Sequence, residues 1–255
     1  MKEEHKTVSL LMLGYNSLRY VKQAIDSVRH QTYPYWELVF VDDCSTDGTW
    51  ELASKMAESD PRIKVYKNEV NLGIVKNRKK AYEYSTGYFV GHLDNDDILE
   101  RWALEEMLWA FSHDKEAMLI YSDCAQIGVE GEHQIYSANP NFDRARLAEF
   151  GWRHLSLFKR EVMEHIDGYN DRLVSACEDG DLFMQIAEKF PVARLPKILY
   201  YHRAHPNNSI QFNKQCNTCS ERPVCNFIRV WAKAANVDPV SLKPNMSVDE
   251  SIEIL

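Results

Sequence analysis

Hydrophobic positions in the first half of the chain follow two alternating patterns. Short runs of consecutive apolar residues predict buried strands at 8–13, 36–41, 63–66, 88–93 and 118–121. Between these runs, apolar residues recur at helical spacing and predict helices at 18–30, 46–57, 75–84 and 101–112. Such alternation is typical of βαβ units, so we expect an α/β fold with a mostly parallel central sheet flanked by helices.

The pattern becomes less regular after residue 122. We expect a hairpin around 128–131, a strand at 155–158, a helix at 179–190 and a strand at 193–201. These elements predict a smaller, mixed region following the parallel part of the sheet. The last residues, 213–255, contain three cysteines and are expected to form a helical extension, with a helix at 227–235.

Composition restricts the classes of partner. The 255 residues carry 30 Lys and Arg against 38 Asp and Glu, a formal charge of −8, and 45% are hydrophobic. A soluble globular protein with a net acidic charge is a poor match for nucleic acid, because phosphate contacts need clustered basic side chains. Six cysteines in a chain of this length favour a reducing compartment over a disulfide framework.

The chain shows neither the pattern of a signal peptide nor an apolar run of the roughly 20 residues that a membrane span needs. We therefore expect a cytoplasmic protein. Peripheral contact with the inner face of the membrane stays open.

Acidic residues follow two of the predicted strands. Asp42 and Asp43 come directly after the second strand, where ligands of open α/β sheets bind, and a carboxylate there can accept from a base or a ribose. The alternative for the neighbouring Ser45 and Asp47 is that they cap the next helix.

The fourth strand is followed by Asp94, Asn95, Asp96 and Asp97. Three carboxylates so close together repel one another unless a positive group neutralises them. Mg²⁺ or Mn²⁺ would do so, since both favour carboxylate and phosphate oxygens. The alternative is a solvated acidic turn that caps a helix, which suits Asp97.

Two further clusters lie in the second half. Glu178, Asp179 and Asp181 stand at the start of a predicted helix, whose N-terminus would stabilise acids, so capping alone could explain one or two of them. His202, Arg203 and His205 follow the last strand and suit phosphate or metal binding, although a surface loop can have the same composition.

Together, these motifs resemble the family 2 glycosyltransferases of the GT-A fold. The resemblance extends over about residues 7–210 and rests on Gly14-Tyr15-Asn16, Ala24–Val28 with Gln31-Thr32, Val41–Thr49, Asn71-Leu72-Gly73 and Leu93–Asp97. It implies a GT-A domain at 1–212, with a nucleotide-binding half at 1–122 and an acceptor half at 123–212.

The resemblance also implies roles for individual residues. Tyr15 would stack near the base, Asp43 would contact it, Arg78 would lie close to the diphosphate, and Asp94 would face the ribose or the metal. Asp96 would be the main metal ligand, with His205 approaching the same metal. In the Glu178-Asp179 pair, Asp179 would be the general base and Glu178 would belong to the nucleotide-sugar site.

The chain departs from the family pattern at several places. Lys79 stands where the family usually has Asn, and one extra Asn follows Pro206, which loosens the alignment of His205. A Gln-x-x-Arg-Trp motif is absent after Asp179, which argues against a processive, membrane-embedded synthase.

These residues predict an inverting, metal-dependent enzyme that moves a sugar from a nucleoside diphosphate sugar, with uridine favoured, to a hydroxyl acceptor. A cation would hold the leaving diphosphate and one carboxylate would take the acceptor's proton. The acceptor would be a carbohydrate or a lipid-linked glycan of cell-surface synthesis, and a homodimer stays open. The alternative is a catalytically silent nucleotide-sugar binding or docking module.

The cysteines of the tail pose a separate question. The tail contains Cys216, Cys219 and Cys225, and the first two have the C-x₂-C spacing with which two thiolates coordinate one Zn²⁺. Only three ligands are visible there, so free thiols are the alternative to a structural zinc.

Overall fold

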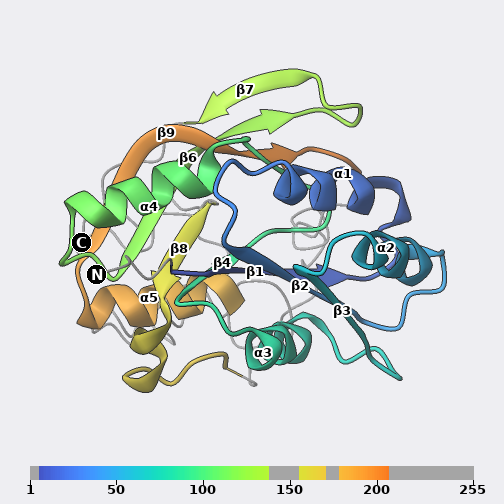
Figure 1. Cartoon of the computed structure of the whole chain (residues 1–255), viewed down its shortest axis with the longest axis horizontal. Coiled ribbons are helices and arrows are strands. Elements are labelled where there is room, and N and C mark those ends of the chain that lie inside the picture. The colour runs from blue at the N-terminus through green and yellow to red at the C-terminus, as the bar shows by residue number, and fades with distance from the viewer. Residues whose placement is uncertain (1–5, 138–154, 171–177, 207–255) are drawn as a thin grey trace, which may run out of the picture.

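The computed structural model describes residues 6–137, 155–170 and 178–206, and in these residues a nine-stranded sheet forms the centre of the molecule. Eight strands follow the order β3-β2-β1-β4-β8-β6-β9-β5, and β7 pairs with β6 (Figure 1). The strands are β1 (Val8–Gly14), β2 (Trp36–Asp42), β3 (Ile63–Lys67), β4 (Phe89–His92), β5 (Ile98–Leu99), β6 (Leu119–Ile127), β7 (His133–Ser137), β8 (Ser156–Lys159) and β9 (Val192–Arg203).

The first four strands in the order β3-β2-β1-β4 are all parallel, as the sequence predicts. Helices cover both faces, which explains why β1 and β2 read as apolar runs without alternation. Leu10, Met12 and Phe40 face the side of α1 (Leu18–Arg29), α2 (Thr49–Glu58) and α4 (Ala103–His113). Leu11 and Val39 face the side of α3 (Ile74–Tyr84) and α5 (Glu178–Lys189) (Figure 1).

The rest of the sheet is mixed. Strand β8 runs antiparallel to both β4 and β6, and β6 runs parallel to β9 with register shifts around Asp123. The expected hairpin is confirmed, because β6 and β7 pair on either side of Gly128–Gly131. The strand predicted at 118–121 extends to Ile127, and β5 and the 3₁₀ turn Arg160–Glu164 are additional elements.

None of the helices in the described residues has the length and apolarity to cross a membrane. The predicted helix at 227–235 and the three cysteines of the tail lie outside the described residues.

The helices α1 and α2 start from one shared carboxylate. Asp47 accepts from the backbone N–H of Leu18 at 3.0 Å through one oxygen and from that of Thr49 at 3.0 Å through the other. This confirms the capping role for Asp47. The loop between β1 and α1 is therefore held by the loop between β2 and α2.

At the amino-terminal end of the strands, Glu37 joins four segments. It accepts from the hydroxyl of Ser9 at 2.6 Å and from the backbone N–H groups of Thr86 and Gly87, and Lys64 forms an ion pair with it. A side chain at Gly87 would clash with the backbone of Ser9, so the close approach requires glycine. Although burial opposes its charge, hydrogen bonds from Lys64 and Ser9 lower the pKa of Glu37 to about 2.

We predict that Glu37→Gln lowers the free energy of unfolding at pH 7 by about 3 kcal/mol, because the ionised form of Glu37 is stabilised only in the folded protein. Since the pKa of Glu37 falls from 4.5 to about 2 on folding, this contribution is complete above about pH 4.5 and is lost as the pH falls towards 2. Urea denaturation of both proteins across this range measures the difference.

The control is Glu58→Gln, which changes an exposed acid at the end of α2 and should alter stability by less than about 0.5 kcal/mol. A Glu37→Gln difference that stays constant between pH 7 and pH 2 would contradict the assignment.

Candidate active site

The carboxyl end of β2 carries the first of the predicted site residues. The backbone N–H of Asp43 donates to Gly14 at 2.7 Å, which places it beside Tyr15 at the end of β1. Its carboxylate accepts from the Asn68 side chain and the Leu72 N–H, both at 2.8 Å, and from the Gly73 N–H at 2.9 Å. Asp43 thus fixes the loop that leads into α3. The neighbouring Tyr15 side chain is 53% exposed.

The loop after β4 brings three carboxylates together. Oxygens of Asp94, Asp96 and Asp97 lie within 4.8 Å of one another. Burial, and then the charges of Asp96 and Asp94, raise the pKa of Asp97 well above its usual range. These three acids therefore form an electrostatically strained group.

Asp97 differs from the other two because it is buried and bound by the protein. It accepts from the Tyr200 hydroxyl at 2.6 Å and from the backbone N–H of Arg203 at 2.7 Å. The solvated, helix-capping turn considered from the sequence is wrong for Asp97, because strand β5 follows it and both oxygens hold β9.

Asp96 and His205 meet although they lie 109 positions apart, with His205 Nε2 2.8 Å from Asp96 Oδ2. Burial and the nearby Asp94 raise the pKa of Asp96, so a positive partner is favoured there. The His205 ring packs against Tyr20 of α1 at 4.7 Å between centroids. The two residues expected at one metal are therefore neighbours.

Arg78 of α3 connects this loop to α5. Its guanidinium is buried and lies 3.4 Å from Asp94 Oδ1 and 3.2 Å from Glu178 Oε1, and it also donates to the carbonyl of Leu11 at 3.1 Å. Although burial disfavours its charge, Glu178 and Asp94 hold the pKa of Arg78 above its ordinary value. Burial and then Asp179 raise the pKa of Glu178 to about 7.

Asp179 lies in the first turn of α5, beside Glu178 and half-buried. One of its oxygens accepts from the backbone N–H of Gly180 at 2.7 Å. Through Glu178 and Arg78, the residue expected to act as the base is connected to the acids after β4.

Comparison with known proteins decides the family. The sequence model of glycosyl transferase family 2 matches residues 9–167, more than half of the chain. The chain belongs to glycosyl transferase family 2.

Among its relatives, this family 2 glycosyltransferase is 30% identical over 204 residues to a chondroitin synthase of Pasteurella multocida. The match covers 79% of this chain and 21% of that synthase, so the chain spans about a fifth of its length.

Solved structures confirm the predicted GT-A fold. S. aureus TarS (residues 1–349), in complex with UDP-GlcNAc, superposes with a TM-score of 0.70 at 21% identity, over 97% of this chain and 69% of that one. A mannosyltransferase of Pyrobaculum calidifontis, in complex with GDP-Man and Mn²⁺, gives a TM-score of 0.69 at 18% identity, over 92% and 66% of the two chains.

The structure also places residues in the site of this glycosyltransferase that the sequence did not single out. Tyr200 donates to Asp97 and accepts from the backbone N–H of Asp94 at 3.3 Å. At the end of β4, His92 Nε2 lies 2.8 Å from the Tyr169 hydroxyl. Tyr200 belongs to the aromatic and basic run at the end of β9, whereas no sequence pattern indicates that His92 and Tyr169 are partners.

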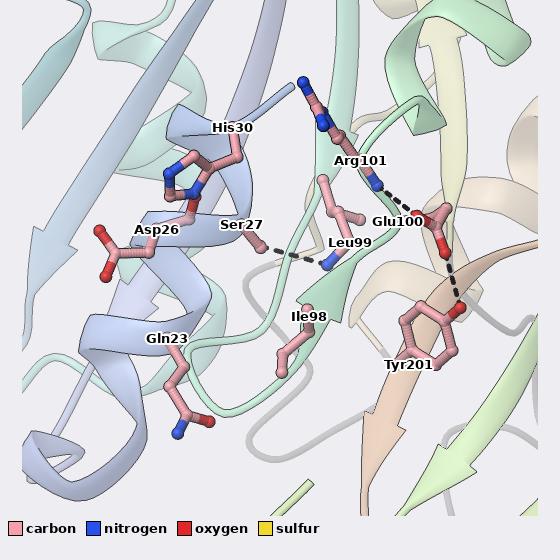
Figure 2. A pocket seen from close by; sticks show the side chains of 9 residues that line it. All are labelled: Gln23, Asp26, Ser27, His30, Ile98, Leu99, Glu100, Arg101 and Tyr201. Carbon is pink, nitrogen blue, oxygen red and sulfur yellow. Dashed lines mark hydrogen bonds between the residues drawn. The ribbon is translucent and has the colours of Figure 1, made fainter. Parts of the chain in front are cut away.

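A separate hollow of about 430 Å³ lies between α1, β5 and β9 (Figure 2). Its lining includes Asp26, His30 and Tyr201 but none of the predicted site residues. The Glu100 carboxylate there accepts from the Tyr201 hydroxyl at 2.7 Å. The acids after β2 and β4, and not this hollow, therefore define the candidate active site.

We predict that Arg78→Met lowers the free energy of unfolding by about 3 kcal/mol, because it leaves buried Glu178 without its guanidinium partner. Adding Glu178→Gln should cost less in this variant than in the wild type, by at least about 1 kcal/mol. A double-mutant cycle by urea denaturation measures this coupling.

The matched control is the exposed pair Lys22–Asp26 of α1, where Lys22→Met should cost less than about 0.5 kcal/mol. Additive effects of the Arg78 and Glu178 changes would show that the buried contact carries no coupling.

Proposed function

We propose that this chain is an inverting glycosyltransferase that moves a sugar from a nucleoside diphosphate sugar, with uridine as the nucleoside, to a hydroxyl acceptor. The observation that carries the proposal is the contact of one buried guanidinium, that of Arg78, with both Asp94 and Glu178. It connects a loop suited to the donor with the helix that presents a candidate base.

The donor would bind at the carboxyl ends of β1 and β2, as ligands do in open α/β sheets. Exposed Tyr15 offers a ring for stacking on the base, and Asp43 orders the loop beside it. The UDP-GlcNAc in the TarS complex supports uridine as the nucleoside. The donor site would be completed by Arg78, Asp94 and Glu178. Because Arg78 and Glu178 are buried, they would line the inner side of that site.

The residues after β4 fit a divalent cation, Mn²⁺ or Mg²⁺. Asp94 and Asp96 supply carboxylate oxygens, and His205 supplies an imidazole at the same place. The repulsion that raises the pKa of Asp96 would be relieved by a cation. When bound, the cation would neutralise the leaving diphosphate, and the Mn²⁺ of the mannosyltransferase complex supports this assignment.

Asp179 would accept the proton of the acceptor hydroxyl. The hydrogen bond from Gly180 orients its carboxylate, and its half-buried position leaves it access to a substrate. A single displacement with one base inverts the anomeric centre, whereas retention by double displacement would need a second carboxylate as nucleophile.

The acceptor would be a carbohydrate or a lipid-linked glycan of cell-surface polysaccharide synthesis. The chondroitin synthase relative supports a polysaccharide. Residues 123–212 would form the acceptor half of a GT-A domain at 1–212. Such an acceptor is consistent with a cytoplasmic enzyme at the inner face of the membrane.

We predict that Asp179→Asn abolishes sugar transfer, by at least about 1000-fold, because the amide cannot accept the acceptor's proton. Binding of UDP should stay within about threefold of wild type, since the proposed role of Asp179 concerns the acceptor hydroxyl and not the nucleotide. Product formation from a panel of UDP-sugars and calorimetric titration with UDP measure the two quantities.

Glu188→Gln is the matched control, an exposed acid on the same helix whose change should leave both quantities unaltered. Transfer that survives in Asp179→Asn would refute the base assignment. Wild-type protein that binds UDP-sugars with no turnover on any acceptor would favour the silent binding module.

Removal of divalent cations by EDTA should abolish transfer, and Mn²⁺ should restore it, because the leaving diphosphate would otherwise meet uncompensated carboxylates. Asp96→Asn should require at least about tenfold more Mn²⁺ for half-maximal rate. Rates measured against Mn²⁺ concentration test both, and turnover unaffected by EDTA would rule out the metal dependence.

A further inference from the structure

Arg203, the last residue of β9, is completely buried and joins three segments that are distant in sequence. Its guanidinium donates through Nε to the carbonyl oxygen of Asp96 at 2.8 Å. Nη1 donates to the carbonyls of Gly128 and Val129 in the β6–β7 turn, at 3.2 and 2.9 Å, and Nη2 donates to the side chain of Gln23 of α1 at 2.6 Å. These four acceptors are neutral.

Arg203 makes a further contact with the acidic loop, which is formed by residues 94–97 after β4. Its backbone N–H donates to Asp97 Oδ1 at 2.7 Å, so Arg203 binds the loop through both its main chain and its side chain. Two residues further along, His205 reaches the carboxylate of Asp96. The ring of Tyr20 packs against both, 5.0 Å from the Arg203 guanidinium and 4.7 Å from the His205 ring.

The chemistry of this position requires arginine. Only the planar guanidinium fork presents donors in several directions at once, while lysine offers a single nitrogen. Burying a guanidinium is costly, so simple packing would be achieved more easily by an apolar side chain. The charge is placed where it fixes the main chain of Asp96 and lies near the acidic group.

We propose that Arg203 is a positioning residue of the cation site. By holding the Asp96 carbonyl against β9, it sets the arrangement of the Asp96 carboxylate and His205 in which a divalent cation would be bound. The inference rests on the proposed cation dependence but makes a separate statement about affinity.

The test uses Arg203→Lys, which keeps the positive charge but loses the fork. Binding of Mn²⁺ alone, followed by the electron paramagnetic resonance signal of the free ion, should be about tenfold weaker than in wild type, the size expected for loss of a group that orients a metal ligand. Thermal denaturation of the same samples reports folding. A folded variant with wild-type affinity for Mn²⁺ would overturn the proposal.

The control is Glu130→Ala, which removes the exposed contact of the same β6–β7 turn with Arg19 of α1. Because this contact does not touch the acidic loop, Mn²⁺ affinity should not change. An equal loss of affinity in this variant would show that docking of the turn, and not the position of Asp96, is responsible.

If Arg203→Lys does not fold, Gln23→Leu decides, since it removes only the acceptor of Nη2. Because one of the hydrogen bonds that orient the guanidinium is lost, Mn²⁺ binding should weaken by about threefold, and unchanged binding would overturn the proposal. Sugar transfer is measured separately: wild-type protein that binds Mn²⁺ but transfers no sugar fails the proposed function and leaves the comparison of affinities valid. Wild-type protein that does not bind Mn²⁺ would overturn the cation site itself.

Discussion

Repulsion between carboxylates at one end of a sheet is the constraint on which the rest of this structure depends. Two parallel strands, β2 and β4, and the helix α5 bring their acids to the same region, and the protein buries only some of them. Asp43, Asp97 and Glu178 are buried and bound by backbone, hydroxyl and guanidinium groups. Asp94 and Asp96 keep exposed surface, at 40% and 20% of their side chains. The buried acids hold neighbouring segments together, and the two more exposed acids are the ones proposed to bind a cation.

The two ends of the sheet use the same kind of group in opposite ways. At the amino-terminal end, Glu37 is surrounded by donors and its charge binds β1, β2, β3 and the turn before β4 together. At the other end, the pKa values of Asp96 and Glu178 are raised, because burial there is not fully compensated. The amino-terminal end of the sheet is thus held together by Glu37, while the electrostatics of the carboxyl end favour an added cation.

Much of this arrangement could be predicted from the sequence because it depends on local patterns. The helix predicted at 18–30 forms as α1, and Ala24, Ile25 and Val28, which recur at helical spacing, are buried. The acids after β2 and β4 could be placed together because the carboxyl ends of parallel strands meet at one edge. Their order along the chain was enough to indicate the family.

Other features could not be predicted, because they depend on contacts between distant residues. Strand β5 has two residues and therefore no period to detect. The burial of Asp97 depends on Tyr200, 103 positions away, and Arg203 reaches Gln23 across 180 positions. No rule of sequence spacing connects such distant residues. Asp97, whose local pattern is that of a solvated turn, is therefore found to be buried and bonded to β9.

The carboxylate of Asp47, which starts both α1 and α2, has a consequence for engineering. The loop that presents Tyr15 and the loop that follows Asp43 share this anchor, together with a second bond, in which the backbone N–H of Thr46 donates to Asn16 Oδ1 at 3.0 Å. Neither loop can be exchanged for that of a relative without disturbing the other. With the donor site proposed above, a change of nucleotide preference would have to be made in both loops at once, as a single unit that is discontinuous in sequence.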